Sequence, residues 1–337
     1  SIEPFSNFRE SKSKNKKNIA LIILIILLII IIIIIALTVF LVLNFKSNEN
    51  DSDIINELSL IYKVNNKYNQ VKLFDISSTN IINSIISMTI NDSDISPINR
   101  YKFNDTGIYN IKIKLKNDLL SIDSLFKNCD NLIEIDLSKF SMEKITNISH
   151  LFFGCSSLTK VNGLNLINEN KIIDMSFLFY GCSSLNKIDL SSFKTSSVIH
   201  MQNMFGYCSS LSEINLNNFD TSNVINMEGL FDSCTSLSSI DLKNFDTSKV
   251  TSMSKMFNKC ISLISIDLNK FNTKNVVDFS SIFNSCYKLK NVFLDNLDTS
   301  NVRSMNQMFR DCTSLITINL NHFRTDKVED IYQMFRI

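Results

Sequence analysis

The stretch from Cys234 to Cys260 reads C-T-S-L-S-S-I-D-L-K-N-F-D-T-S-K-V-T-S-M-S-K-M-F-N-K-C, and close relatives of this unit recur along the chain. Each of the eight cysteines has a Phe three residues before it and a Leu three residues after it. They are Cys129, Cys155, Cys182, Cys208, Cys234, Cys260, Cys286 and Cys312, spaced by 26 residues apart from one spacing of 27. A fixed period of this length predicts a stack of repeated units.

Each unit contains two hydrophobic periodicities. Ile240-Asp241-Leu242 alternates between apolar and polar side chains, as a short strand does. The second half of the unit predicts a helix of about three turns, because its apolar residues fall on one helical face. These residues are Val250, Met253, Met256, Phe257 and Cys260. Thr247 and Ser248 stand where a helix N-cap would lie. A unit of 26 residues cannot enclose its own apolar side chains, so neighbouring units must stack.

The pattern L-x-x-I-D-L resembles a leucine-rich repeat, and the whole unit is similar to the BspA-like surface-protein repeats. The resemblance covers residues 120–337, although Phe245 and its equivalents stand where the leucine-rich pattern has Asn. It implies a solenoid at a cell surface, associated with adhesion. We therefore expect an α/β repeat fold, a leucine-rich-repeat-like solenoid with one short parallel strand and one short helix per unit. About eight units fit the sequence, and residue 337 falls inside a ninth.

An apolar run near the N-terminus predicts a membrane anchor. Residues 19–45 are long enough to cross a bilayer as a helix, and the run exceeds the apolar region of a cleaved signal peptide. Five basic side chains precede this run and one closely follows it. Since positive charge favours the cytoplasmic side, we expect residues 1–18 in the cytoplasm. The prediction is a single-pass plasma-membrane protein with an extracellular repeat domain.

Residues 46–119 lie outside the repeat period and are expected to form a juxtamembrane linker and a β-rich N-terminal cap. Residues 58–64 and 71–76 predict two strands, and Ile111, Ile113 and Leu115 alternate with lysines as a one-sided strand does.

The cysteine column has three interpretations. One cysteine per unit, with no second ligand at close spacing, does not match a zinc site. Disulfides are awkward because stacked strands hold equivalent positions about 4.8 Å apart, whereas bridged Cβ atoms lie about 3.8 Å apart. We therefore expect a buried ladder of free thiols, and no metal or cofactor.

Side chains on the outward strand face are the candidate binding residues, because they vary between units while the core columns do not. They are Lys160, Lys187, Asp189, Glu213, Asn215, Asp241, Asp267, Phe293 and Asn319. Stacked aspartates such as Asp241 and Asp267 could attract Ca²⁺, but solvent or nearby lysines would relieve their repulsion equally well. Absence of packing constraint would produce the same variation.

The remaining features favour binding over catalysis. The chain has 34 basic and 33 acidic residues, so its net charge gives no reason to expect a nucleic-acid partner. It contains no phosphate loop, zinc-protease motif or nucleophile elbow, so we expect no enzyme. The expected role is adhesion, or binding of an extracellular protein or glycan. The alternatives are a laterally self-associating coat, or an intracellular scaffold if the orientation is reversed. Possible glycosylation sites are Asn50, Asn91, Asn104 and Asn147.

Overall fold

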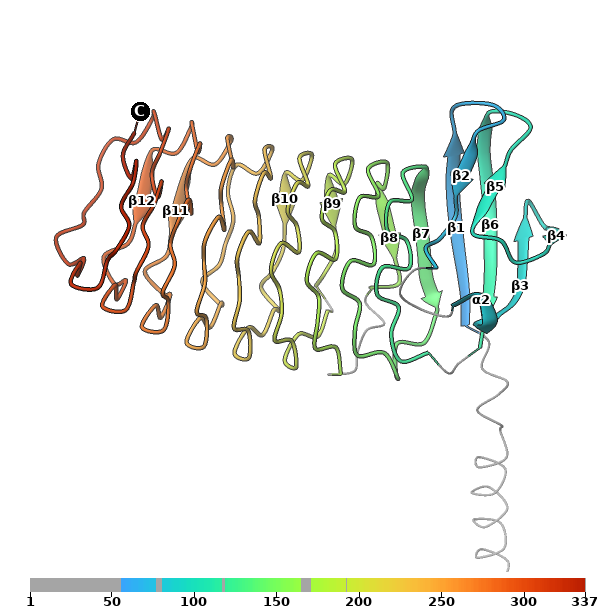
Figure 1. The fold of residues 1–337 in the computed structure, drawn as a ribbon, viewed down its shortest axis with the longest axis horizontal. Coiled ribbons are helices and arrows are strands. Elements are labelled where there is room, and N and C mark those ends of the chain that lie inside the picture. Colours follow the sequence, from blue (N-terminus) through green and yellow to red (C-terminus); the bar gives the residue numbers. More distant parts are fainter. Residues whose placement is uncertain (1–55, 77–80, 117–118, 165–170, 192, 337) are drawn as a thin grey trace, which may run out of the picture. The chain divides into compact units, whose positions relative to one another are not determined.

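The computed structural model describes residues 56–76, 81–116, 119–164, 171–191 and 193–336. Within these ranges the chain forms strands, turns and one helix of four residues (Figure 1). The elements of the N-terminal part are β1 (Asn56–Val64), β2 (Gln70–Lys72), α2 (Ile81–Ser84), β3 (Ile85–Ile90), β4 (Ser93–Ile95), β5 (Arg100–Lys102) and β6 (Gly107–Leu115). The repeat region contains β7 (Leu132–Lys139), β8 (Lys160–Asn162), β9 (Lys187–Ile188), β10 (Glu213–Ile214), β11 (Ser265–Asp267) and β12 (Asn291–Phe293).

The largest sheet joins the N-terminal strands to the first repeat units. Its order is β4-β3-β6-β1-β7-β8, and β1 pairs antiparallel with both β6 and β7. From β7 to β8 the pairing becomes parallel, and β9 with β10 and β11 with β12 form further parallel pairs. Alternate residues of β1 are buried, including Leu58, Leu60 and Tyr62. The opposite face of this sheet is therefore available to solvent.

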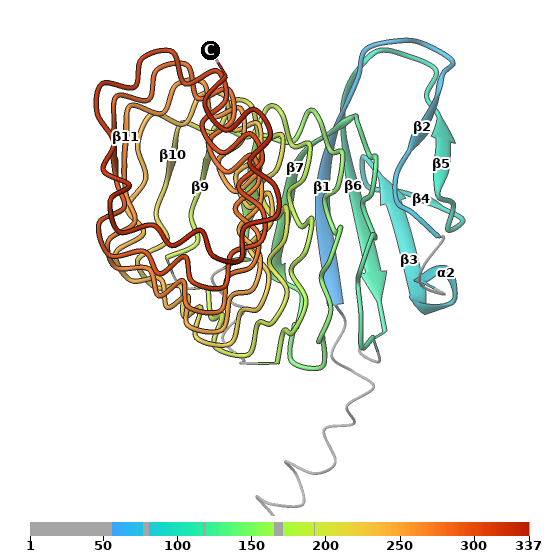
Figure 2. The same cartoon turned by 60° about the vertical axis from the view of Figure 1, so that its left-hand side comes forward.

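The expected α/β solenoid with a helix in every unit is wrong. Among the described residues α2 is the single α-helix, and the repeat units are coils of turns with short strands (Figure 2). The predicted helix face is buried, but Lys255 and Lys259 within it have φ of 56° and 55°. An L-residue in this left-handed region cannot continue an α-helix. Two consecutive tight turns thus bury the same apolar residues that a helix would.

The hydrogen bonds of these turns explain why the coil replaces the helix. The backbone N–H of Met256 donates to the Met253 carbonyl at 3.2 Å, within the same coil. The intervening N–H groups donate to the next coil instead, with Lys255 to Ser280 at 2.9 Å and Phe257 to Ile282 at 2.9 Å. An α-helix would place all of these bonds inside one segment. Four of the seven backbone bonds donated to backbone carbonyls by residues 253–260 run to the next coil, so these turns are complete only when the coils are stacked.

The predicted helix N-cap serves as another link between coils. The hydroxyl of Thr247 donates to the Asn272 carbonyl at 3.0 Å and accepts the Asn272 N–H at 2.8 Å. Asp246 accepts the Ser248 N–H at 2.9 Å, which closes a local turn. Thr247 is 1% exposed, so its two bonds satisfy a polar group that would otherwise be costly to bury.

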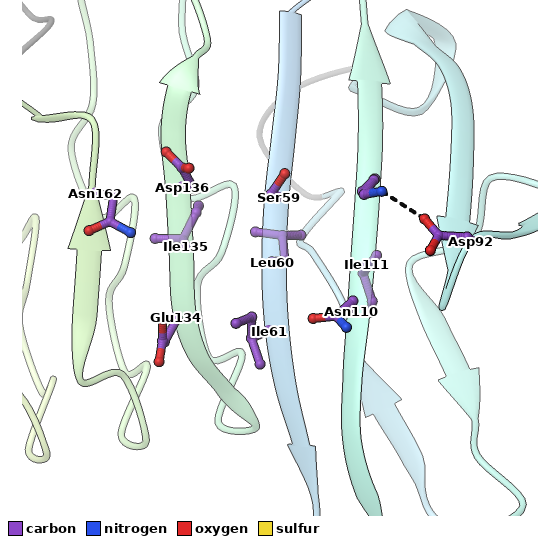
Figure 3. A pocket seen from close by; sticks show the side chains of 11 residues that line it. Ser59, Leu60, Ile61, Asp92, Asn110, Ile111, Glu134, Ile135, Asp136 and Asn162 are labelled. Atoms are coloured by element: carbon purple, nitrogen blue, oxygen red, sulfur yellow. Dashed lines mark hydrogen bonds and ion pairs between the residues drawn. The ribbon is translucent and has the colours of Figure 1, made fainter.

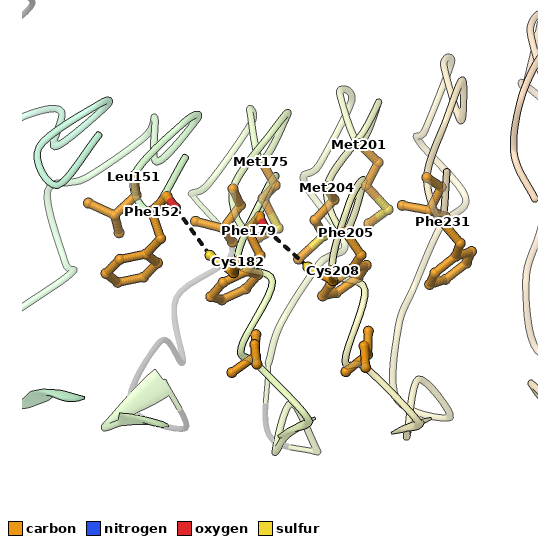
Figure 4. Close-up of a cluster of buried hydrophobic side chains, with 14 of the residues drawn as sticks. Leu151, Phe152, Met175, Phe179, Cys182, Met201, Met204, Phe205, Cys208 and Phe231 are labelled. Carbon is orange, nitrogen blue, oxygen red and sulfur yellow. Dashed lines mark hydrogen bonds between the residues drawn. The ribbon is translucent and has the colours of Figure 1, made fainter. Parts of the chain in front are cut away.

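The core consists of columns of equivalent side chains from successive coils (Figure 4). Phe179 and Phe205 stack with ring centroids 5.8 Å apart and an interplanar angle of 8°. Phe205 and Phe231 repeat this arrangement at 5.7 Å and 2°. Offset aromatic pairs contribute about 0.5–1.5 kcal/mol each beyond their burial. The column thus stabilises the contact between each coil and the next.

The membrane prediction needs a correction. The predicted transmembrane helix, residues 19–45, and the predicted cytoplasmic segment, residues 1–18, lie outside the described residues. Across the part that the structure describes, no helix has the length and apolar character to cross a bilayer. The predicted localisation, a single-pass plasma-membrane protein with an extracellular repeat domain, is withdrawn.

Candidate functional site: the outward strand face

All nine predicted binding residues are exposed on the strand side of the coils. Lys160, Lys187, Glu213, Asp267 and Phe293 belong to β8, β9, β10, β11 and β12. The other four are Asp189, Asn215, Asp241 and Asn319, which occupy the same repeat position as Asp267 and Phe293 in other coils. The structure therefore brings all nine to one side of the repeat region, spread along it rather than gathered at one point.

Ion pairs neutralise several charges on this face. Lys187 lies 3.0 Å from Glu213 in the adjacent coil, and Lys160 lies 3.6 Å from Glu134. Both lysine side chains are more than half exposed. Exposed pairs of this kind contribute about 0–1 kcal/mol to stability. Their main effect is to fix the order of charges along the surface.

The Asp and Asn column has a structural role that its sequence did not reveal. Each Oδ1 atom accepts the backbone N–H two residues further on and closes a turn at the end of the strand. The donor–acceptor distance is 2.9 Å for Asp189, 3.1 Å for Asn215, Asp241 and Asn319, and 2.8 Å for Asp267. The Lys243 ammonium group, which donates to Asp241 at 2.7 Å, and then the Lys243 backbone N–H hold the pKa of that carboxyl below its ordinary value. Within the described ranges, no three His, Cys, Asp or Glu residues are placed to hold a metal ion.

A row of polar side chains crosses the large sheet at the start of this face. Thr89 on β3 pairs with Lys112 on β6, and Lys112 pairs with Ser59 on β1. Ser59 in turn pairs with Asp136 on β7, and Asp136 with Asn162 on β8. Figure 3 shows Ser59, Asp136 and Asn162 on neighbouring strands of this sheet. We call these five residues the polar row.

The polar row crosses a shallow hollow of about 280 Å³. A second line of outward residues borders it, with Ile61 on β1 paired to Asn110 on one side and to Glu134 on the other. Asp92 completes the lining and accepts a 2.7 Å hydrogen bond from the Lys112 ammonium group (Figure 3). The hollow thus combines hydroxyl, amide, carboxylate and ammonium groups with one apolar side chain facing outward.

None of the residues that line this hollow is among the nine predicted binding residues. Ser59, Lys112 and Asn110 belong to the N-terminal part, which the sequence assigned only a capping role. Their one signal is alternation, because Ser59 and Ile61 interrupt the buried residues of β1. That pattern places them on the outward face but does not tell which strand they adjoin.

Three exposed apolar side chains stand among polar residues near the far end of the described strand face. Phe293 is 47% exposed and pairs with Asp267 on β11. Ile264 and Ile316 are 47% and 71% exposed, in equivalent positions of the preceding and following coils. Aromatic side chains in such settings are frequent contact residues of protein interfaces.

The eight cysteines lie inside the repeat region, where all are buried and unbridged. Each thiol from Cys155 onward donates to a Phe carbonyl of the preceding coil at 3.0–3.2 Å. Figure 4 draws two of these bonds, from Cys182 to Phe152 and from Cys208 to Phe179. Cys129, in the first coil, instead neighbours the buried Tyr62. Desolvation raises the pKa of Cys208 to about 12, so this column carries no reactive thiolate at neutral pH.

The possible glycosylation sites have different surroundings. Asn104 is exposed, and Asn91 is exposed while its Oδ1 accepts the Asn110 N–H at 2.9 Å. Asn147 is half-buried, and its Oδ1 accepts the Ser149 N–H at 2.8 Å inside the coil stack. Asn50 lies outside the described residues.

Comparison with known proteins gives one family. Three overlapping segments, residues 120–239, 209–296 and 263–337, match the sequence profile of a family described as Mycoplasma protein of unknown function, DUF285. The matched segments together cover the whole repeat region. No curated protein matches the chain.

Proposed function

The chain belongs to the DUF285 family, and from that premise we propose that it is a non-catalytic binding protein whose outward strand face contacts a protein or glycan partner. The observation that carries the proposal is that the core residues and the strand-face residues of each coil are separate sets. Phe, Met, Leu and Cys side chains fill the core and link the coils, whereas the strand face contributes nothing to the core. The resemblance to BspA-like repeats, which are associated with adhesion, supports the same role.

The acidic residues of the face favour binding over catalysis. A general acid or base normally has a pKa tuned towards neutral pH by its surroundings. The carboxyls of Asp189 and Asp241 have pKa values shifted below their ordinary value by hydrogen bonds within their turns. These groups remain charged at neutral pH and are suited to hold a surface contact.

A charge exchange tests the proposal. Lys187→Glu and Glu213→Lys each break the 3.0 Å ion pair, and the double variant restores the pair with its polarity reversed. The full chain is applied to a panel of immobilised purified proteins and glycans. We expect the wild type to bind a panel member and both single variants and the double variant to lose binding. The double variant should keep the wild-type melting temperature, because its ion pair is intact.

Lys255→Glu is the matched control, since Lys255 is exposed on the turn side of the same repeat region. Its charge change should leave binding unaltered. Equal binding by the wild type and the double variant would contradict a contact at this part of the face.

Self-association is the second candidate, favoured by the exposed apolar group Ile264, Phe293 and Ile316. Sedimentation of the full chain over a range of concentrations distinguishes the two. A surface coat predicts ordered oligomers that Phe293→Ser dissolves, whereas the primary proposal predicts that this variant changes binding to a different molecule.

A further inference from the structure

The polar row joins two parts of the chain that are far apart in sequence. Residues 56–64 and 107–115 supply β1 and β6, while β7 and β8 begin the repeat region. Because β1 pairs with β6 and β7, hydroxyl, amide and charged side chains from five strands line up across one sheet. Strands in a sheet lie about 4.8 Å apart, so the four row members that line the hollow, Lys112, Ser59, Asp136 and Asn162, present polar groups at regular intervals. We infer that this row and its hollow bind an uncharged oligosaccharide lying across the strands.

The inference rests on the proposed function and names the partner class for one end of the face. A sugar chain presents hydroxyl groups along its length, each both a donor and an acceptor. The row offers donors from Lys112 and Asn162, acceptors from Asp136 and Asn162, and a hydroxyl from Ser59 that is both. Asp136 accepts the Ser138 N–H at 2.8 Å, and a carboxylate has further lone pairs for ligand hydroxyls.

The backbone pairing disfavours an extended peptide as the occupant. Strand addition requires an edge strand with unpaired N–H and C=O groups. Beneath the hollow, β1 is paired on one side with β6 and on the other with β7. A peptide placed on this face could form no ladder with β1 and would depend on side-chain contacts alone.

The charges disfavour a polyanion. The lining holds three carboxylates, of Asp92, Glu134 and Asp136, against the one ammonium group of Lys112. Lys160 adds a positive charge 3.6 Å from Glu134, which still leaves one net negative charge. A phosphate or sulfate chain would meet repulsion here, whereas a neutral hydroxyl group can donate to the free lone pairs of the carboxylates and accept from the free N–H groups of the lysines.

The shape of the hollow agrees with a chain rather than a small compact ligand. Pockets for small molecules usually enclose about 300–1,000 Å³ and bury most of the ligand. This hollow is about 280 Å³ and lies on an open sheet face, so it accommodates part of a longer molecule. Ile61 is the apolar residue of the outward lining and offers a surface for the C–H face of a sugar ring.

The test is calorimetry of the full chain with neutral pentasaccharides of glucose, N-acetylglucosamine and mannose. A heparin pentasaccharide and pentalysine serve as charged comparators. We expect at least one neutral pentasaccharide to bind, and Ser59→Val and Asn162→Leu each to weaken it about fivefold to tenfold. Ser265→Val is the control, because Ser265 is an exposed outward strand residue further along the same face. It should bind like the wild type, and the melting temperatures of all variants should agree.

Three outcomes overturn the inference. The first is binding of a neutral sugar that Ser59→Val and Asn162→Leu leave unchanged, which would place the ligand elsewhere. The second is preferential binding of heparin or pentalysine, which would make charge the recognised feature. The third is no sugar binding at all by a chain that still shows charge-exchange-sensitive binding of a protein, in which case the proposed function stands and the oligosaccharide does not. If the charge-exchange test fails while a neutral pentasaccharide binds through Ser59, the sugar site holds and the wider face does not.

Discussion

The carboxyl group of Asp232 is a buried acid in the repeat region, and burial disfavours its charged form. Its side chain is 6% exposed, and its Oδ1 accepts hydrogen bonds from the Ser233 hydroxyl at 2.9 Å and the Asn258 amide at 2.8 Å. Burial raises its pKa above the ordinary 3.8 despite these two bonds. A raised carboxyl pKa means that the contribution of this group to stability is greatest below pH 3.8 and falls as the pH rises through the folded-state pKa.

Asp232→Asn should therefore raise the melting temperature at pH 7 and leave it unchanged near pH 3. The amide oxygen can accept both hydrogen bonds without carrying a charge. Calorimetry at pH 3, 5 and 7 gives the comparison. Asp246→Asn is the opposite control, because the Ser248 bond lowers the pKa of Asp246 and its ionised form stabilises the fold. A lower melting temperature of Asp232→Asn at pH 7 would show that the hydrogen bonds of the carboxylate outweigh its desolvation.

At Cys208, a thiol hydrogen bond and core packing make separable contributions. The thiol donates to the Phe179 carbonyl at 3.1 Å, and the residue is fully buried. Cys208→Ala removes the donor and some volume, which should lower the free energy of unfolding by about 1–2 kcal/mol. Cys208→Ser keeps a donor and should be less destabilised than Cys208→Ala in urea unfolding. If serine is the worse substitution, packing of the apolar sulfur is the dominant contribution.

At the scale of a single coil, a glycine substitution at Lys255 distinguishes a turn from a helix. Lys255 has φ of 56°, a conformation that costs an L-residue about 1–2 kcal/mol and costs glycine little. Lys255→Gly should therefore leave the free energy of unfolding unchanged or raise it by up to about 1 kcal/mol, whereas in a helix it would lower it by about 1 kcal/mol. Lys274, which is exposed and has no positive φ, provides the control, since Lys274→Gly should destabilise. Urea unfolding of both variants measures the difference.

The same coil shows why the sequence indicated the wrong element. Apolar residues at Val250, Met253, Met256 and Phe257 fit one face of a helix, and they fit two successive tight turns equally well. The deciding feature is φ at Lys255 and Lys259, and neither residue is a glycine or asparagine that would announce a left-handed turn. The buried columns were predictable because burial follows from the repeat. The path of the backbone was not evident from this unit alone, and its signal lay in the preceding unit, where Gly229 stands at the position of Lys255 and has φ of 59°.

For the whole molecule, the sheet that holds the polar row depends on pairing between distant segments. Alternation predicted strands within residues 58–64 and 111–115, and both belong to strands of the structure. It contained no information on which strand would meet the first repeat unit. Register decides whether Ser59 lies beside Asp136, and register follows from tertiary packing rather than from either strand alone. The outward face of the repeat units was therefore predictable from the repeat, but the hollow formed where β1 meets β7 was not.

Because the cysteines of every coil are buried, we expect the stability of the whole repeat region to fall at alkaline pH. Burial raises the pKa of every thiol above the ordinary 9.0, to about 12 for Cys129, Cys208 and Cys312. The folded state thus keeps neutral thiols where the unfolded chain would ionise. Their contribution to stability is complete below pH 9 and is lost as the pH rises from 9 towards 12.

The contribution of each thiol to the free energy of unfolding should fall by up to about 1.4 kcal/mol per pH unit above 9. For eight thiols the summed loss near pH 10 is comparable to the total stability of a typical domain, about 5–15 kcal/mol. We expect the melting temperature, followed by circular dichroism in the presence of a reductant, to be level from pH 7 to 8.5 and to fall steeply between pH 9 and 10.5. Cys208→Ala has one thiol fewer and should show a slope shallower by about one eighth. Most of the fall should precede lysine deprotonation, which centres at about pH 10.4. A melting temperature that stays constant to pH 10 would mean that the thiols can ionise within the folded stack, which would contradict their raised pKa values.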